Sequence, residues 1–182
     1  MPPTWAQETM SPGNTQTAPQ AASESTQTPD NLRPLATDNN LLSIAAGKRL
    51  MEEARQAVAE QNYQRAVEKL QSSREIFNQL SNFHQQLSAS FSGINNQIEE
   101  THRRLALESA EMRDEATYQL ALVHRANNQP ELSVPLLIQI IRSQQPTRDL
   151  GQKAYQQLFE LGFVEAPYTA GTEGAPTSFT GP

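Results

Sequence analysis

Residues 97–126 contain no glycine, proline or asparagine, the residue types that most often end or interrupt a helix. An uninterrupted helix over this range would be about 45 Å long at about 1.5 Å per residue. The neighbouring segments also carry apolar side chains at helical spacing, and the chain lacks both alternating β-branched runs and Asn-Gly or Asp-Gly hairpin turns. The sequence therefore predicts an all-α fold.

The remaining helices are predicted from apolar spacing and from the residues that start and stop helices. The segment 38–40 can cap the first helix, and Gly162 can close the last one. Pro130 fits the first position of a helix, whereas a start at the alternative cap Ser133 would place Pro135 harmlessly in the first turn. We expect helices over residues 41–60, 63–80, 97–126, 130 or 133 to about 144, and 147–161.

An apolar stripe at near-heptad spacing connects the second of these helices to the third. Ser81 and Asn82 are expected to interrupt the helix before the stripe, and the segment 93–96 is expected to end one helix and start the next. The stripe could instead pair with a second copy of the chain in a coiled-coil homodimer. Its members are Leu87, Phe91, Ile94, Ile98, Leu105 and Met112.

Composition separates a folded middle from two tails. Hydrophobic residues make up 36% of the chain, and they are scarce at both ends. Residues 1–37 consist mainly of Pro, Thr, Gln, Ser and Ala, and residues 164–182 are rich in Gly, Pro, Thr and Ala. Such segments bury too little apolar surface to offset the entropy of ordering. We therefore expect disordered tails around one helical domain at 38–163.

Charge and residue types narrow the function. The formal net charge is −6 with no basic face, so nucleic acid is not an expected partner. The longest apolar run, Val134–Ile141, is much shorter than the roughly 20 residues of a membrane span. The chain has no cysteine and its first residues lack a secretory signal pattern. We expect a cytoplasmic protein with no membrane insertion and no cofactor.

Two segments resemble the tetratricopeptide repeat family, which stacks helix–turn–helix units of about 34 residues. The first unit is Gly47–Leu80, with Asn62 and Tyr63 at its turn, and the second is Asp114–Thr147, with Asn128 at its turn. The segment Gln152–Phe159 resembles the family's extra capping helix. The matching helix positions are Leu50, Ala54, Ala66, Leu70 and Ser73 in the first unit and Leu120, Ala121, Leu137 and Ile140 in the second, with Pro146 near the family's closing proline.

The segment between these units departs from the family pattern. Glu100 and Arg104 stand where the family has a small and an apolar residue, and the turn expected over 108–114 has no helix breaker. One hairpin, a long bridging helix and a terminal hairpin would explain the same residues. The resemblance implies a TPR-like scaffold, adaptor or assembly factor that binds another protein. By the repeat pattern, its groove would be lined by Tyr63, Gln64, His84, His102 and Tyr118.

The segment from Pro130 to Ile141 is apolar on every side, which is typical of a buried helix. In the repeat-like arrangement, the segments 97–126 and 149–161 would cover it on two sides. The alternative is an apolar groove that binds a partner helix or a second copy of the chain.

Metal binding and catalysis are weakly supported by the sequence. On continuous helix, His84 and His102 would lie about 27 Å apart, and His102 and His124 about 33 Å apart, so a shared ion requires a sharp reversal of the chain. The Glu99–His102 spacing matches a di-iron motif that needs a second copy, and the chain has one. The acidic residues Glu108, Glu111, Asp114 and Glu115 have arginines within helical reach, which is typical of an exposed charged face. We therefore predict a non-enzymatic protein.

Trp5 is the one tryptophan of the chain and lies in the predicted N-terminal tail. It is either an isolated aromatic residue or the anchor of a short linear motif that orders on a partner. Phe179 could act similarly at the other end.

Overall fold

The computed structural model describes residues 40–168, and all regular secondary structure in this range is helical. This confirms an all-α fold for the described residues. The predicted N-terminal tail, with Trp5, and residues 169–182 lie outside the described range. The helices are α1 (Ile44–Ala59), α2 (Tyr63–Phe91), α3 (Asn96–Ala126), α4 (Pro130–Gln144) and α5 (Asp149–Glu160).

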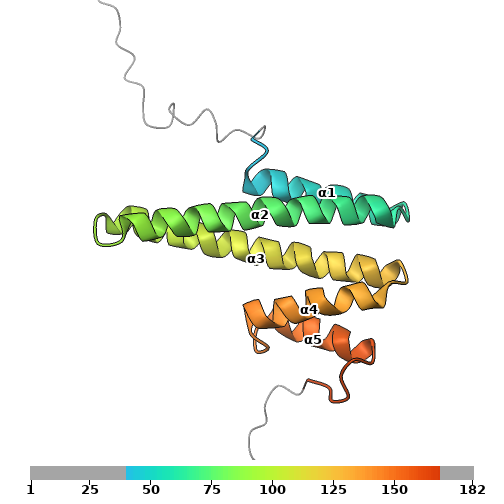
Figure 1. Cartoon of the computed structure of the whole chain (residues 1–182). Coiled ribbons are helices and arrows are strands. Elements are labelled where there is room, and N and C mark those ends of the chain that lie inside the picture. Colours follow the sequence, from blue (N-terminus) through green and yellow to red (C-terminus); the bar gives the residue numbers. More distant parts are fainter. Residues whose placement is uncertain (1–39, 169–182) are drawn as a thin grey trace, which may run out of the picture. The chain divides into compact units, whose positions relative to one another are not determined.

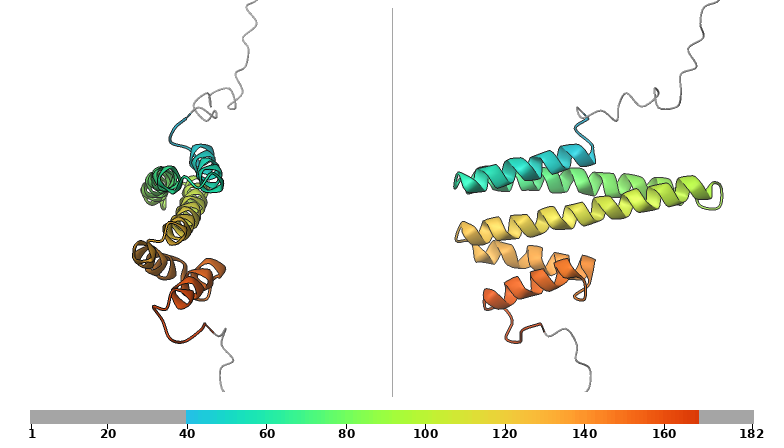
Figure 2. Two further views of the ribbon diagram at one scale, coloured as in Figure 1. Left: turned by 90° about the vertical axis from the view of Figure 1, so that its right-hand side faces the viewer. Right: turned by 180° about the vertical axis from the view of Figure 1, so that it is seen from behind.

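Short turns connect the helices, so each helix runs antiparallel to the one before it (Figure 1). The main packing contacts join successive helices from α1 to α5, and all described residues belong to one compact unit. Seen end-on, the helices alternate between two sides, with α2 and α4 on one side and α1 and α5 on the other (Figure 2). In this arrangement α1 and α3 both pack against α2 and barely contact each other.

Polar side chains fix the starts of the first three helices. Ser43 Oγ accepts a hydrogen bond from the Ala46 amide at 3.0 Å, so α1 begins a few residues after the predicted cap at 38–40. Asn62 caps α2 and Asn95 caps α3 in the same way, each through its side-chain oxygen. These caps satisfy amides that have no partner inside the helix.

The second helix is longer than the sequence predicts, and the interruption expected at Ser81 and Asn82 is wrong. Ser81 is fully buried, and its hydroxyl donates to the Ala106 carbonyl of α3 at 3.1 Å. Because α3 supplies this partner, the polar side chain stabilises the helix pair rather than ending the helix. The chain reverses at residues 92–95, where Gly93 takes a positive φ of 73°. The predicted break near 93–96 is therefore confirmed.

The first apolar cluster holds α1, α2 and α3 together around Phe77, Leu70 and Leu120, all nearly inaccessible to solvent. Small residues of α1 allow this close packing. A Cβ atom on Gly47 would lie 2.5 Å from the ring of Phe77, so only glycine leaves room for that ring. The Gly47 carbonyl also accepts a hydrogen bond from the buried Ser73 hydroxyl.

A second cluster joins α4 to α3 and α5. Leu137 and Ile140 of α4 are buried against Ala121, Ala154 and Leu158. This confirms that the apolar segment packs between its two neighbouring helices. The helix begins at Pro130, with Pro135 inside it. Its outer side remains open to solvent, because Leu132 and Ile138 are 44% and 45% exposed.

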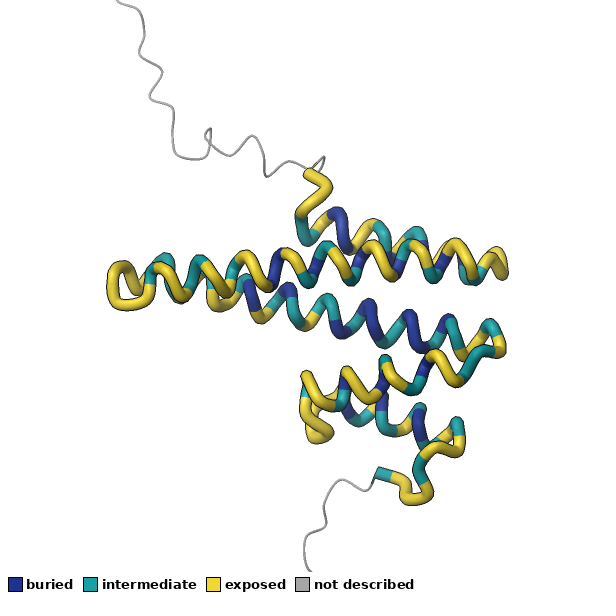
Figure 3. The backbone as a smooth tube through the Cα atoms, viewed as in Figure 1, coloured by how far each residue is buried: buried dark blue, intermediate teal, exposed yellow. Residues whose placement is uncertain are grey.

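The end of the α2–α3 pair projects beyond the other helices (Figures 1 and 2). We call residues 81–106 the overhang. Buried positions are concentrated where α1 and α4 cover the pair, and the overhang is largely exposed or half-buried (Figure 3). The overhang is thus a two-helix structure without a third covering layer.

Candidate functional site

An apolar groove runs between α1 and α3, and we call it the α1–α3 groove. Its lining comes from α1 and α3 and from the buried Leu70 of α2, which forms its floor. Arg55 and Gln119 are its polar lining residues. The cavity has a volume of about 420 Å³, and its apolar lining comes from Ala54, Val58, Leu70, Leu122, Val123 and Ala126. An open apolar cavity of this size is typical of a binding site.

The predicted residues Tyr63 and Gln64 lie at the start of α2. Tyr63 is half-buried and packs against the first apolar cluster. Gln64 is exposed and donates to Glu68 at 3.1 Å within the same helix. Neither residue lines the α1–α3 groove.

The structure brings His84 and His102 together in the overhang. Their Nδ1 atoms lie 3.0 Å apart, and the rings stack with centroids 5.2 Å apart. The separation of about 27 Å that a continuous helix would give does not apply, because the chain reverses between the two residues. Burial lowers the pKa of His84, and the nearby His102 lowers it further. In the neutral pair, one Nδ1–H donates to the other Nδ1.

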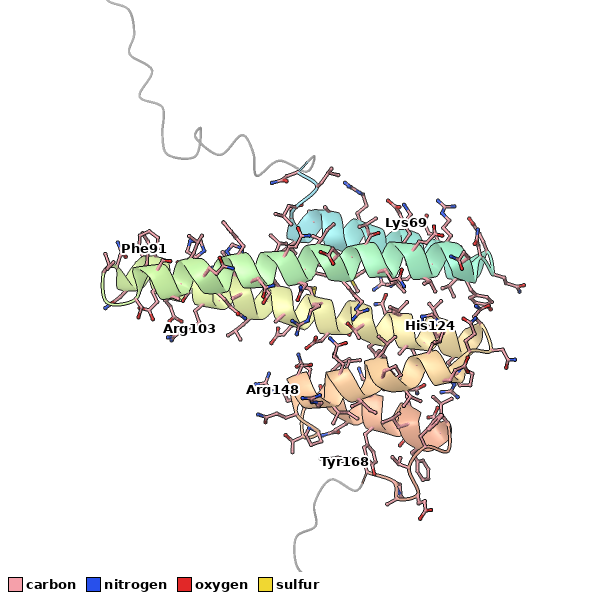
Figure 4. The ribbon with its side chains drawn as sticks, viewed as in Figure 1. Lys69, Phe91, Arg103, His124, Arg148 and Tyr168 are labelled. Carbon is pink, nitrogen blue, oxygen red and sulfur yellow. The ribbon has the colours of Figure 1, made fainter. Side chains whose placement is uncertain are left out.

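His124 lies far from this pair. Figure 4 shows His124 near one end of α3, whereas Phe91 and Arg103 lie toward the other end of the α2–α3 pair, in the overhang. Its Nδ1 is 3.4 Å from the side-chain oxygen of Gln129. Among residues 40–168, no group of three or more His, Asp or Glu side chains is arranged to hold a metal ion.

Tyr118 faces a different part of the structure from the histidine pair. It is half-buried and packs against the cluster formed by α3, α4 and α5. Burial raises the pKa of its hydroxyl, and the charges of Glu115 and Glu160 raise it further. Tyr118 also lines a cavity of about 350 Å³ with Tyr168 and side chains of α5. Of the predicted residues within 40–168, His84 and His102 are the two from different helices that the structure brings into direct contact.

A polar cavity where α2, α3 and α4 meet was not predicted from the sequence. We call it the arginine pocket, and its volume is about 430 Å³. Its residues come from segments that are far apart in the chain and have no recognisable motif. They are Gln71, Arg74, Glu75 and Asn78 of α2, Arg113 of α3 and Gln139 of α4.

Beside this pocket, Asp114 is fully buried, and its prediction as part of an exposed acidic face is wrong. Arg113 contacts one carboxylate oxygen through Nε at 3.0 Å and Nη2 at 2.9 Å. The other oxygen accepts hydrogen bonds from Ser143 Oγ and Gln144 Nε2, both at 2.7 Å. Asp114 therefore ties the end of α4 to α3 and orients Arg113. This role depends on α4, which a pattern within α3 cannot reveal.

No helix in the described part of the chain combines the length and apolar character needed to cross a membrane. Comparison with protein-family models, with curated proteins and with solved structures finds no match to this chain.

Proposed function

We propose that the chain is a non-catalytic protein-interaction module that binds an amphipathic helix of a partner protein in the α1–α3 groove. The observation that carries this proposal is the groove itself, an open apolar trough between two helices with a third helix as its floor. Binding would bury the apolar lining of the groove against the apolar face of the partner helix and so remove both apolar surfaces from water. A scaffold, adaptor or assembly factor acts through binding of this kind, and we propose a cytoplasmic location.

The TPR-like organisation belongs to the same proposal. Its support is the succession of antiparallel helices, with α1 and α2 as one unit, α3 and α4 as the next, and α5 as the cap. The continuous α3 passes through residues 108–114, where a middle repeat would need a turn. The proposed array therefore has two units with unusually long inner helices.

Site-specific crosslinking in native lysate tests the groove. A photoreactive amino acid at Arg55, which is exposed beside the groove, should give one discrete crosslinked protein. The same label at the exposed Gln86 in the overhang is the control. The introduced change Ala126→Lys should abolish the crosslink, because it places a charge in the groove at an exposed position.

Ala89→Lys is the matched variant, since Ala89 is also an exposed helical alanine. It should leave the Arg55 crosslink intact. Equal crosslinking from Arg55 and Gln86, or equal loss in both lysine variants, would show that the groove is not the binding site.

A second candidate is self-association through the overhang together with the adjacent Leu107 of α3. Phe83, Ile94 and Leu107 are 51%, 78% and 61% exposed, and Leu107 lines a further cavity of about 310 Å³ between α2 and α3. A second copy of the chain could cover these side chains. Sedimentation should then show a dimer that Leu107→Asp dissociates. A monomer at every concentration would eliminate this candidate.

A further inference from the structure

The arginine pocket is distinct from the α1–α3 groove and shares no lining residue with it. It lies where α2, α3 and α4 meet, and Figure 2 shows α2 and α4 on the same side of the helix stack. Two arginines from different helices line it, together with three neutral amide side chains and Glu75. A concave site of this composition offers several hydrogen-bond donors to one small ligand.

Neutral partners hold the guanidinium of Arg74 in place. Its Nε donates to Thr117 Oγ1 at 2.9 Å, and its Nη2 donates to the Gln139 side-chain oxygen at 3.3 Å. Thr117 in turn donates its own hydroxyl hydrogen to the Arg113 carbonyl at 2.7 Å, which leaves an oxygen lone pair for Arg74. The guanidinium is therefore oriented by its surroundings before any ligand arrives.

Among residues 40–168, the charge of Arg74 has no counterion at contact distance. No carboxylate forms an ion pair with Arg74 within residues 40–168, although the side chain is only partly exposed. Burial lowers its pKa, and the positive charge of Arg113 lowers it further, while Asp114 acts in the opposite direction. A partly desolvated cation beside a second cation favours the binding of an anion.

The charges around the pocket favour an anion with a single charge over one with several. The buried Asp114 neutralises Arg113 through two contacts. Glu75 lines the pocket and keeps its negative charge, since the hydrogen bond it accepts from Gln79 at 2.8 Å comes from a neutral amide of the same helix. Glu75 would therefore repel a multiply charged anion most strongly, whereas one planar carboxylate matches the planar donor geometry of the Arg74 guanidinium, which forms no ion pair within residues 40–168.

We propose that the arginine pocket binds a carboxylate group, with Arg74 as its main contact, Arg113 as the second cation and the side-chain amides of Gln71 and Asn78 as additional donors. The carboxylate would occupy the side of Arg74 that Thr117 and Gln139 leave open. Glu75 weakens binding by charge repulsion and so limits the affinity of the site. This inference does not depend on the partner proposed for the α1–α3 groove.

Nuclear magnetic resonance of the arginine side chains in the full chain tests the proposal. Acetate should shift the Arg74 Nε–H signal along a saturable curve, whereas chloride at equal ionic strength should not. Arg74→Gln should weaken acetate binding by about tenfold or more, because charge-assisted hydrogen bonds are lost. Arg104→Gln is the matched control, since it removes the same charge from an exposed position on α3 and should leave binding unchanged.

Glu75→Gln provides a test that does not depend on removing an arginine, because Glu75 is exposed. It should tighten acetate binding about threefold by removing a negative charge beside the ligand. Unchanged or weaker binding in this variant would overturn the proposal even if Arg74→Gln failed to fold. Saturable binding of phosphate without binding of acetate would also overturn it.

Two further ligands identify the source of the carboxylate. A capped tripeptide with a central glutamate represents an acidic side chain of a partner, and succinate represents a free small acid. Tighter binding of the tripeptide assigns the pocket to a polypeptide ligand. Tighter binding of succinate assigns it to a small molecule, and failure of both to bind contradicts the proposal.

Discussion

The same two helices, α2 and α3, are held together by different chemistry at their two ends. Where α1 and α4 cover the pair, Phe77, Leu70 and Leu120 are buried in an apolar cluster. In the overhang, hydrogen bonds link the two helices, including those of Ser81 with the Ala106 carbonyl and of His84 with His102, while apolar side chains such as Leu87 and Ile98 are only half-buried. The stability of the covered end therefore depends on how closely its apolar side chains fill the available volume. The stability of the overhang depends more on the geometry of its hydrogen bonds.

The difference follows from the number of covering layers. A pair of helices alone cannot enclose large apolar side chains, so residues such as Phe83 in the overhang remain half exposed. Small buried side chains let the two backbones approach, and serine hydroxyls then reach carbonyls of the facing helix. A hydrogen bond of this type adds about 0.5–1.5 kcal/mol, which is less than the burial of a large apolar side chain. We therefore expect the overhang to be the less stable end.

The largest effect should come from Phe77→Ala. It leaves a cavity in the fully buried cluster, and we expect the free energy of unfolding to fall by about 3–5 kcal/mol. Phe83→Ala on the same helix is the matched control, with an expected change within about 0.5 kcal/mol because Phe83 is 51% exposed. Urea unfolding measures both. Similar losses in the two variants would show that the two ends are equally packed.

Gly47→Ala should have the next largest effect. Helix propensity alone would favour alanine by about 1 kcal/mol. The new Cβ would overlap the Phe77 ring, and overpacking of this kind costs about 1–3 kcal/mol, so we expect a net loss of stability. In a Phe77→Leu background the overlap should disappear and Gly47→Ala should become stabilising. Thermal unfolding of the four chains measures this reversal, and its absence would contradict the contact.

Ser81→Ala should destabilise by about 0.5–1.5 kcal/mol, because it removes a buried hydrogen bond between α2 and α3. Amide hydrogen exchange should become faster over residues 81–106 and remain unchanged over 63–80. Ser90→Ala is the control, since the exposed Ser90 bonds only to Gln86 of its own helix. Uniformly faster exchange along α2 would mean that the overhang does not open separately.

The histidine pair should produce the smallest effect, a dependence of stability on pH. Since the folded-state pKa of His84 lies below its ordinary value of 6.5, the unfolded chain binds more protons just below that value. The contribution of His84 is therefore fully present above about pH 6.5 and decreases as the pH falls through the folded-state pKa. Urea unfolding at several pH values should show this decrease in the wild type.

His84→Gln should reduce the decrease, and His124→Gln should leave it unchanged, because His124 lies outside the pair. A wild type and a His84→Gln variant with identical pH profiles would contradict the assignment of this effect to the pair.

The sequence predicts the local parts of this fold well, because helix formation and capping involve nearby residues. The helix over residues 63–80 is predicted from apolar spacing, and the apolar residues at that spacing, Ala66, Leu70, Phe77 and Leu80, are buried. The start of α4 at Pro130 and the reversal near Gly93 are also local signals. The predicted interruption at Ser81 is wrong because the Ala106 carbonyl, which is distant in the sequence, accepts a hydrogen bond from the buried Ser81 hydroxyl.

The sites are harder to predict, since they combine residues from different helices. Arg74 meets Thr117 and Gln139 across α3 and α4, and no spacing within α2 indicates that meeting. The α1–α3 groove likewise requires the relative position of three helices. The contact between His84 and His102 becomes predictable only once the turn at 92–95 is placed, because the turn sets the pairing of the two helices.

The tip of the overhang has a practical consequence for experiments on this protein. Gly93 has no neighbouring atom near the position of a Cβ, and the residues around it are exposed. Substitution of Gly93 is restricted by its positive φ and not by a lack of space for a side chain. An affinity epitope or a fluorescent domain spliced between residues 93 and 94 would extend into solvent away from the groove and the arginine pocket. It would offer a handle for imaging and purification at a distance from both proposed sites.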